Sequence, residues 1–376
     1  MAEWKKSFLK LGHRAETEFD RLKARLEKRL ARDKPIQILI YRGFGTVEGA
    51  VHVKGRVLRD KPIAPATDND TVWRNMLSVY RRFESDELAD VRLHVRFGEL
   101  EEEVVTDEEG YFTVVLEGKR PFSSHTLWHP ITVTLLDELV ENQGVIEAEG
   151  QVIFPNHSSS FGVISDIDDT ILQTFATNLI KVAQLTFLHN AYTRLPFAGV
   201  AAFYQALQAG GAGANPIFYV SSSPWNLYDL LSDFMELNEI PAGPIFLRDL
   251  GLDSRKMFAL KHKEHKLGQI RHLLTTYPDL PFILIGDSGQ EDPEIYREAV
   301  ELFPDRILAI YIRDVSRDER DAEIRSISQE LAADVPLLLV PDTYAAAQHA
   351  AANGFIPFAA LPKILQDRDA NPTHEA

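Results

Sequence analysis

The sequence predicts an α/β protein: a doubly wound parallel sheet with flanking helices, preceded by an antiparallel β-sandwich domain and an N-terminal amphipathic helix. Three patterns predict it. Apolar residues recur every three or four positions near the start, alternate with polar ones up to about residue 160, and then form short apolar runs separated by helical patterns. We expect the boundaries to fall as a helix over 1–35, a β-sandwich over 36–160, an α/β domain over 161–360 and a flexible tail over 361–376.

The first segment is predicted to be one helix over residues 3–33, ended by Pro35. Its apolar stripe includes Trp4, Phe8 and Leu11 and continues to Leu30. Residues 1–35 carry eleven Lys or Arg and six Asp or Glu, a balance of +5, which leaves −21 for the rest of the chain. Two interpretations stay open: the helix packs on protein, or it lies on an anionic membrane surface.

Composition excludes several classes of function. A length of 376 residues favours two domains, and a net charge of −16 argues against a nucleic-acid partner. The absence of cysteine excludes disulfides, thiolate metal sites and a cysteine nucleophile. We expect no transmembrane segment and no signal peptide, because long uncharged apolar runs are lacking. These features predict a cytoplasmic protein, with peripheral membrane contact left open.

The region from 36 to 160 is predicted to be a β-sandwich, because β-branched residues alternate with polar ones in several short segments. Asp107-Glu108-Glu109-Gly110 predicts a hairpin turn between two strands, and residues 58–88 a long loop with a short helix. The expected strands are QILIY, VHVKGRV, VRLHVRF, YFTVVL, ITVTLL and IEAEGQVIF. No group of residues here supports catalysis.

From residue 161 onward, short apolar strands alternate with helical patterns, as in a parallel sheet covered on both faces. In such sheets ligands bind at the carboxyl ends of the strands. The expected strands are FGVIS, PIFYV, PIFL, FILIG, ILAIY and PLLLV, and the expected helices include 200–209, 225–238, 264–276 and 292–303.

The first of these strands ends in the acidic segment SDIDDT. Residues two apart in extended chain project to the same side, so Asp166 and Asp168 are predicted to face one pocket. Two crowded carboxylates repel unless a cation or a shared proton lies between them. A solvated acidic turn is the alternative. A calcium loop is excluded, because Ile171 and Thr177 stand where an EF-hand needs Gly and Glu.

The second strand runs into Ser221, Ser222 and Ser223, followed by Pro224. Ser223 as a helix N-cap with Pro224 at the first helical position is the simple interpretation. Hydroxyl and amide donors at a strand-to-helix junction also form an anion site.

A third buried strand ends in Gly286-Asp287, and Asp292 follows five residues later. Asp292 before Pro293 is interpreted first as a cap of the next helix. Asp287 at a strand end is a hard oxygen ligand of the kind that suits Mg²⁺.

The segment LKHKEHKLGQI places Lys261, Lys263 and Lys266 at the start of a helix. A solvated charged face is the default interpretation for each of them. An ammonium group would also offset the charge of a phosphate and of the acidic residues around it.

Taken together, these clusters resemble the haloacid dehalogenase (HAD) superfamily, which has a Rossmann-like parallel sheet. The Asp-x-Asp-x-Thr motif matches Asp166, Asp168 and Thr170, and the strand ending in Ser matches Ser221. The lysine motif best matches Lys266, and the last motif matches Asp287 with Asp292 behind it.

The segments DIDDTI, YVSSSPWNLY, His265-Lys266 and FILIGDSGQEDPEIY are similar to a narrower family within 160–315. This is the catalytic domain of the actin-patch type of phosphatidate phosphatase and its bacterial relatives. The resemblance implies a phosphoric monoester hydrolase. It further implies a phosphatase or phosphomutase, because dehalogenases lack the second carboxylate and transport ATPases place Thr there.

The resemblance also implies site roles. Asp166 is the expected nucleophile, forming an aspartyl phosphate, and Asp168 the acid and base. Mg²⁺ is expected on Asp166, Asp287 and residue 168, through the Asp168 main-chain carbonyl, with Asp292 in support. Phosphate-binding residues are expected to be Thr170, Ser221, Ser222 and Lys266.

The expected substrate is a phosphatidate-like lipid phosphate at a membrane surface. The segment ATNLIKVAQLTFLHNAYTRLPF after Thr170 is apolar enough to form a lid, although an ordinary covering helix is the alternative. Two other functions are weighed: a phosphatase of soluble phosphate monoesters, and a non-catalytic binding protein with a degenerate HAD domain. None of the motif carboxylates is missing, which disfavours the latter.

Overall fold

The computed structural model describes residues 35–59, 86–118, 126–156, 158–172, 196–210, 214–248, 258–315, 318–331 and 334–370. Four sequence predictions fall wholly or mostly outside these residues. They are the N-terminal helix, the loop over 58–88, the apolar segment after Thr170 and the last residues of the predicted tail.

The N-terminal half forms one nine-stranded sheet, whose strands are antiparallel apart from the β2–β9 pair. The predicted antiparallel β region is therefore confirmed. Its strands are hydrogen-bonded into one sheet in the order β1-β3-β2-β9-β8-β5-β6, and β4 and β7 also pair with β3. Alternate residues of β3 point into a shared apolar core, as its period of two predicts. The strands are β1 Ile36–Ile40, β2 Gly43–Gly45, β3 Val51–Arg59, β4 Asp86–Glu87, β5 Arg92–Phe97, β6 Leu100–Val105, β7 Tyr111–Leu116, β8 Trp128–Leu135 and β9 Glu147–Ile153.

The turn predicted at 107–110 is present, but it does not make a hairpin. The backbone N–H of Gly110 donates to the carbonyl of Asp107 at 3.0 Å, which closes the turn. The strands on either side pair with different partners, β6 with β5 and β7 with β3. The turn therefore carries the chain from one neighbour pair to another, which a local sequence signal cannot distinguish from a hairpin.

The C-terminal half contains a six-stranded parallel sheet in the order β12-β11-β10-β13-β14-β15. This confirms the predicted α/β fold. The chain adds strands outward from β10 in one direction and then returns to its other side with β13, so the order reverses there. The crevice at such a reversal is where ligands bind in open parallel sheets. The strands are β10 Gly162–Ser165, β11 Ile217–Pro224, β12 Ile245–Arg248, β13 Phe282–Asp287, β14 Ile307–Arg313 and β15 Leu337–Val340.

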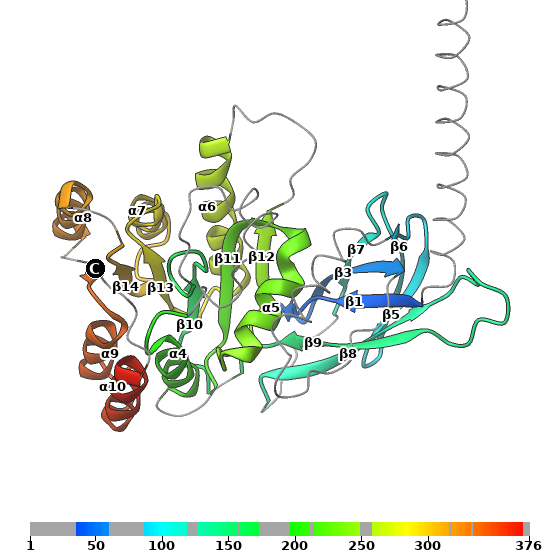
Figure 1. Ribbon diagram of the computed structural model, residues 1–376, viewed down its shortest axis with the longest axis horizontal. Coiled ribbons are helices and arrows are strands. Elements are labelled where there is room, and N and C mark those ends of the chain that lie inside the picture. The colour runs from blue at the N-terminus through cyan, green and yellow to red at the C-terminus, as the bar shows by residue number, and fades with distance from the viewer. Residues whose placement is uncertain are drawn as a thin grey trace, which may run out of the picture.

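Helices cover both faces of the parallel sheet (Figure 1). Helices α6, α7 and α8 share one apolar core with the sheet, and α4, α5, α9 and α10 share the other. Successive strand residues alternate between the cores, as Val163 and Ile164 do in β10. The helices are α4 Val200–Ala209, α5 Tyr228–Leu237, α6 Phe258–Thr276, α7 Asp292–Leu302, α8 Asp318–Leu331, α9 Thr343–Ala352 and α10 Leu361–Ala370, with short 3₁₀ turns at Trp225–Leu227 and Phe358–Ala360.

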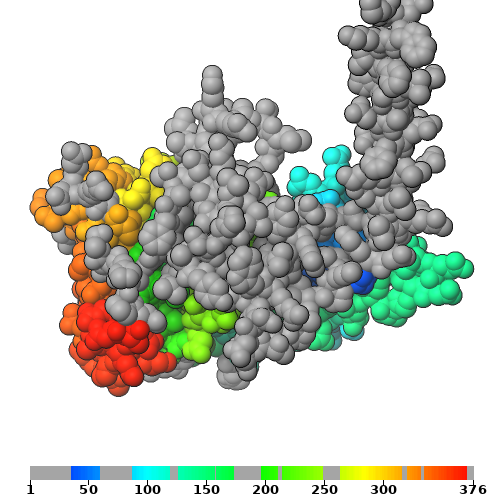
Figure 2. All heavy atoms as spheres, viewed as in Figure 1, coloured from blue at the N-terminus to red at the C-terminus, as the bar shows by residue number. Residues whose placement is uncertain are grey.

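The prediction of a flexible tail over 361–376 is wrong for residues 361–370, which form α10. Ile364 is fully buried against α4 and α9, and Arg368 pairs with Asp342 at 3.1 Å. Leu361, Ile364 and Leu365 lie at helical spacing, but they span little more than one turn and polar residues follow them, which is too short a periodic signal to predict a helix. In the space-filling view α9 and α10 lie at one end of the molecule and the β8–β9 region lies at the other (Figure 2).

The two sheets meet through aromatic side chains. Tyr41, just after β1, stacks on Trp225 at 5.4 Å and on Tyr228 at 3.9 Å between ring centroids. The backbone N–H of Arg42 donates to the Tyr228 hydroxyl at 2.7 Å, and its guanidinium donates to Ser232 at 2.7 Å. These contacts join the N-terminal sheet to the segment that directly follows β11.

A second set of contacts extends this interface to β12 and α6. Phe44 packs against Phe246 and the edge of His272, and the Tyr277 hydroxyl donates to the carbonyl of Gly45 at 2.9 Å. Burial lowers the pKa of His272. The interface is therefore largely apolar and aromatic, and Tyr41 and Phe44 join the two cores on either face of the parallel sheet.

Candidate active site

The predicted site residues come together at the carboxyl edge of the parallel sheet. Asp166 follows β10, Ser221 lies near the end of β11, and Asp287 ends β13. Asp292 begins α7, and Lys266 reaches in from α6. Because β10 lies between β11 and β13, the order of the strands brings the side chains at their carboxyl ends close together.

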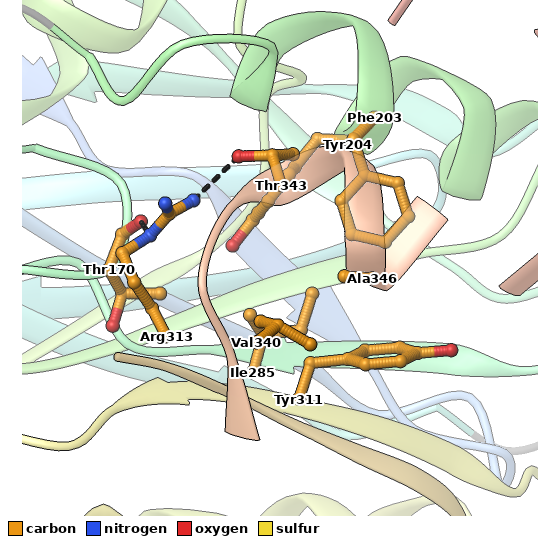
Figure 3. Close-up of a pocket in the computed structure, with 9 residues that line it drawn as sticks. All are labelled: Thr170, Phe203, Tyr204, Ile285, Tyr311, Arg313, Val340, Thr343 and Ala346. Atoms are coloured by element: carbon orange, nitrogen blue, oxygen red, sulfur yellow. Dashed lines mark hydrogen bonds between the residues drawn. The ribbon is translucent and has the colours of Figure 1, made fainter. Parts of the chain in front are cut away.

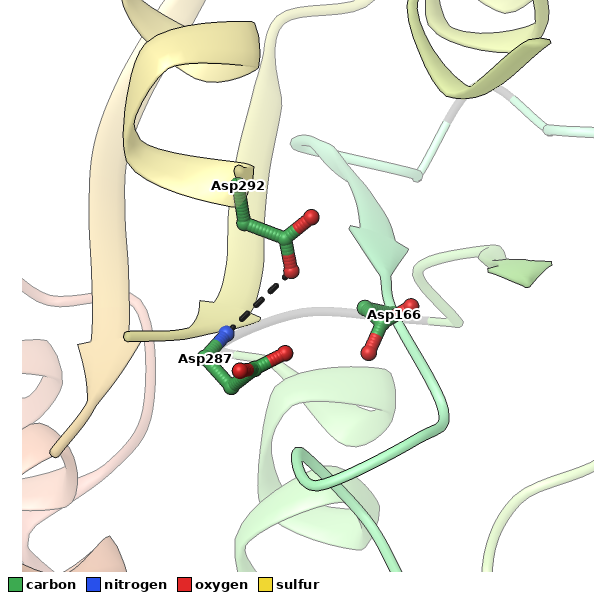
Figure 4. A group of neighbouring side chains, drawn as sticks. All are labelled: Asp166, Asp287 and Asp292. Carbon is green, nitrogen blue, oxygen red and sulfur yellow. Dashed lines mark hydrogen bonds between the residues drawn. The ribbon is translucent and has the colours of Figure 1, made fainter. Parts of the chain in front are cut away.

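Three carboxylates form the centre of the site. Oxygen atoms of Asp166, Asp287 and Asp292 lie within 4.8 Å of one another, and all three side chains are buried (Figure 4). Lys266, also buried, places its Nζ 2.7 Å from Asp166 Oδ1 and 2.7 Å from Asp292 Oδ1. One ammonium thus faces three carboxylates.

The carboxylates of this cluster shift one another's pKa values, because one ammonium faces three of them. Burial, reinforced by Asp292 and Asp287, raises the pKa of Asp166 well above its usual range, although Lys266 opposes the shift. Burial and then repulsion from Asp292 raise the pKa of Asp287 to about 8. Burial alone would lower the pKa of Lys266, but its attraction to Asp166 and the other carboxylates outweighs burial and raises it.

With all four groups ionised, three negative charges face one positive charge, which leaves a buried charge of −2. Charge of this size inside a protein is costly unless it is paired or bound to a metal. The donor set is made of hard carboxylate oxygens, which suit Mg²⁺ and not soft metals. The residues therefore fit a divalent cation.

Gly286 makes room for Asp292 against β13. A Cβ at position 286 would lie 2.5 Å from Asp292 Oδ2, so any larger residue would push that carboxylate away. In this position Asp292 Oδ2 accepts the backbone N–H of Asp287 at 3.2 Å. The interpretation of Asp292 as a helix cap is wrong, because Glu291 stands at the N-cap position and the Asp292 carboxylate accepts hydrogen bonds from Lys266 and from the Asp287 backbone.

Asp168 does not point its carboxylate into the three-carboxylate cluster. Its Oδ2 accepts hydrogen bonds from Ser221 at 2.8 Å and from Ser223 at 3.2 Å. The Ser221 hydroxyl also accepts the backbone N–H of Ser223 at 3.0 Å. Two serines on β11 therefore fix the orientation of Asp168, two residues from Asp166.

Ser223 is a site residue that the sequence interpretation missed. β11 continues to Pro224, the 3₁₀ turn after it has no side-chain cap, and Ser223 bonds Asp168. The N-cap interpretation of Ser223 is therefore wrong. The alternation of Ser221 and Ser223, two apart on a strand, was the signal that could have revealed both. Ser222, between them, has a buried hydroxyl without a hydrogen-bond partner among the described residues.

The loop that carries the first two aspartates is held by its own hydrogen bonds. Thr170 Oγ1 donates to Asp166 Oδ2 at 3.2 Å, and Ile171 N–H donates to the carbonyl of Ile167 at 2.9 Å. Asp169 has a φ of 55°, a left-handed conformation that costs a non-glycine residue about 1 kcal/mol or more. Such a sharp loop keeps Asp166 and Asp168 pointing toward the sheet edge.

Arg313, at the end of β14, braces this loop from behind. Its Nε donates to the carbonyl of Thr170 at 3.2 Å, its Nη2 donates to Thr343 at 2.6 Å, and its guanidinium lies over the Phe197 ring at 3.9 Å. A cavity of about 20 Å³ lies beside it (Figure 3). That volume holds roughly one water molecule, so it is a gap in packing and not a substrate pocket.

Lys263 forms its ion pair away from the carboxylate cluster. Lys263 pairs with Glu298 at 2.9 Å on a half-exposed surface, in agreement with the default interpretation. The side chain of Lys261 lies outside the described residues. Of the three lysines in this segment, the structure places Lys266 at the carboxylates.

Comparison with known proteins agrees with this arrangement. Residues 161–314 match the family described as phosphatidate phosphatase APP1, catalytic domain. Phosphatidate phosphatase APP1 of Saccharomyces cerevisiae is 36% identical over 172 residues, 45% of this chain and 29% of the yeast protein. An uncharacterised protein of Schizosaccharomyces pombe is 30% identical over 257 residues, 65% of this chain and 40% of that protein.

The matches therefore span less than half the length of these relatives. Among solved structures, a carbohydrate acetylesterase from Xanthomonas citri aligns over 89% of this chain and 74% of its own. With a TM-score of 0.31 and 9% identity, this similarity is too low to indicate a shared fold or function. The segment that holds the carboxylate cluster, residues 161–314, belongs to the family of phosphatidate phosphatase APP1 catalytic domains.

Proposed function

We propose that this protein is a Mg²⁺-dependent phosphatase that hydrolyses phosphatidate through an aspartyl phosphate on Asp166. The observation that carries the proposal is the buried group of Asp166, Asp287 and Asp292 around Lys266 at the reversal point of the sheet. Family membership of the same segment supports the reaction type and the lipid substrate.

In the proposed reaction, an Asp166 carboxylate oxygen forms a bond to phosphorus as the ester P–O bond breaks. Asp168 donates a proton to the departing alcohol oxygen. It then accepts a proton from the water that attacks the aspartyl phosphate, which releases inorganic phosphate and regenerates Asp166. The hydrogen bonds from Ser221 and Ser223 hold the Asp168 carboxylate beside Asp166.

The remaining roles concern charge. Lys266 offsets negative charge on Asp166 and on the phosphate, and Ser222 supplies a hydroxyl donor to the phosphate. Thr170 and Ser221 lie beside the phosphate and donate their hydroxyl protons to Asp166 and Asp168. We assign the cation to Asp166, Asp287 and the backbone carbonyl of Asp168, with Asp292 holding Lys266 and the Asp287 backbone in place. A bound Mg²⁺ would offset the buried negative charge and favour the ionised form of Asp166.

The substrate class is tested with the full-length chain. Phosphatidate in mixed vesicles and a panel of soluble phosphate monoesters are compared with MgCl₂ and with EDTA, and Asp166→Asn serves as the inactive control. We expect phosphate release from phosphatidate only with the metal. Faster hydrolysis of soluble esters would point to the alternative function, and no turnover of any ester would refute the phosphatase.

We also propose that the enzyme works in the cytoplasm at a membrane surface. Among the described residues, no helix is both long enough and apolar enough to cross a membrane. The support for surface contact is the basic character of residues 1–35. Vesicle flotation of wild type and of a Lys5→Glu, Lys6→Glu, Lys10→Glu variant checks this; equal binding to anionic vesicles would reject it.

A further inference from the structure

Gln290 lies beside the carboxylate cluster, in the turn between β13 and α7. Its half-buried side-chain amide donates to Asp287 Oδ2 at 3.2 Å and to the backbone carbonyl of Asp168 at 3.4 Å. Both oxygens belong to the ligand set assigned above to the cation. One amide group thus bridges two of the oxygens that a metal ion would need.

The backbone of Gln290 is fixed, whereas its side chain is held only by long bonds. The Gln290 N–H donates to Asp287 Oδ1 at 3.0 Å, and its carbonyl accepts from Arg320 at 3.1 Å. Arg320 is itself held by Glu294 of α7 at 2.7 Å. The side-chain bonds, including one from Lys266 to Oε1 at 3.4 Å, lie at the weak end of hydrogen-bond lengths. The amide can therefore turn away without moving the turn.

The chemistry of the amide makes it a competitor of a cation. A primary amide carries two N–H donors, which match two acceptor oxygens. A Mg²⁺ ion binds oxygens at about 2.0–2.1 Å, and an N–H directed at the same oxygens would be driven against the ion. Donor and cation therefore exclude each other at this pair of oxygens.

We propose that the Gln290 amide and the divalent cation compete for Asp287 and the Asp168 carbonyl, so that Gln290 lowers the affinity of the site for the metal. The amide donors partly satisfy the carboxylates, and the ion must displace them to bind. This inference rests on the proposed metal site, but it concerns binding and not turnover. It makes Gln290 a residue that sets the metal concentration at which the enzyme loads.

The test measures metal binding to full-length, metal-depleted protein without substrate. Mn²⁺ is titrated and the free ion is followed by its electron paramagnetic resonance signal, with Mg²⁺ added as a competitor. Gln290→Met keeps the length of the side chain without its donors, and Gln290→Ala removes it. Gln205→Met is the matched control, because Gln205 bonds Glu239 and Lys363 on an exposed surface far from the cluster along the chain.

We expect both Gln290 variants to bind Mn²⁺ about tenfold more tightly than wild type, which corresponds to about 1.4 kcal/mol. The control should bind as wild type does. Unchanged Kd values in folded Gln290 variants would overturn the proposal. Weaker binding would also overturn it, because it would make Gln290 a ligand. If wild type binds neither ion, the metal site of the proposed function fails first and this inference with it.

Discussion

The role of Lys266 gives the sharpest test of the electrostatics of the site. Lys266 is 2% exposed and lies 2.7 Å from both Asp166 and Asp292. Lys266→Met removes the positive charge and keeps an unbranched side chain of similar length. Breaking a buried ion pair on one side costs about 3–5 kcal/mol, because the partner charge stays buried without compensation.

For a unit of about 200 residues, a loss of this size lowers the melting temperature by roughly 10 °C. The assay is thermal unfolding of full-length protein in EDTA. The loss should be larger at pH 8 than at pH 5, because carboxyl groups with raised pKa values take up protons at the lower pH and the repulsion then weakens. Added MgCl₂ should restore part of the stability.

Lys263→Met is the matched control on the same helix. Lys263 pairs with Glu298 at 2.9 Å, but the two side chains are 39% and 37% exposed. An exposed pair contributes at most about 1 kcal/mol. If Lys266→Met melts within about 2 °C of Lys263→Met, Lys266 does not balance the carboxylates and the electrostatic argument is wrong.

Three further predictions concern neighbouring residues. Asp166→Asn should lower phosphatase turnover to less than about 1% of wild type while the protein stays folded by circular dichroism; higher activity would remove it as nucleophile. In EDTA, Asp287→Asn should melt higher than wild type at pH 8 but not at pH 4. Because burial raises the pKa of Asp287 in the folded protein to about 8, ionisation of this carboxyl destabilises the folded protein as the pH rises from about 4 to about 8. The loss in free energy of unfolding is on the order of 5 kcal/mol at most. Gly286→Ala should displace Asp292 and weaken Mn²⁺ binding, whereas Gly268→Ala, which has open space at its Cβ, should bind Mn²⁺ normally.

The sequence predicted the parallel sheet well, because a strand buried on both faces is a continuous apolar run and its carboxyl end is marked by the polar residues that follow. FILIGD and GVIS show this pattern, and both lie at the centre of the sheet. The same rule predicts from the sequence alone that Asp166, Ser221 and Asp287 meet at one edge of the sheet. Strand β6, LEEEVV, was missed, because four of its six residues are exposed and the period of two is lost.

Other features depend on contacts between distant residues and leave little trace in the local sequence. Ser223 and Asp292 both satisfy the rules for helix caps, yet each bonds a partner in another part of the site. Gln290 lies in a polar turn, and Arg313 ends an apolar strand, positions where a polar side chain can take many roles. The turn at 107–110 has a hairpin sequence, but its flanking strands choose other partners. In each case the local sequence allows several structural roles, and contacts with distant residues determine which one is adopted.

The aromatic contacts between the two sheets have a practical consequence for expressing the C-terminal half as a fragment. A fragment cut at residue 160, where the family match begins, would lose Tyr41 and Phe44 and leave the rings of Trp225, Tyr228 and Phe246 facing water. We expect such a fragment to aggregate on its own and to be recovered in the supernatant when the preceding half is co-expressed as a separate chain. A soluble, monomeric fragment would mean that the C-terminal half folds without these aromatic contacts.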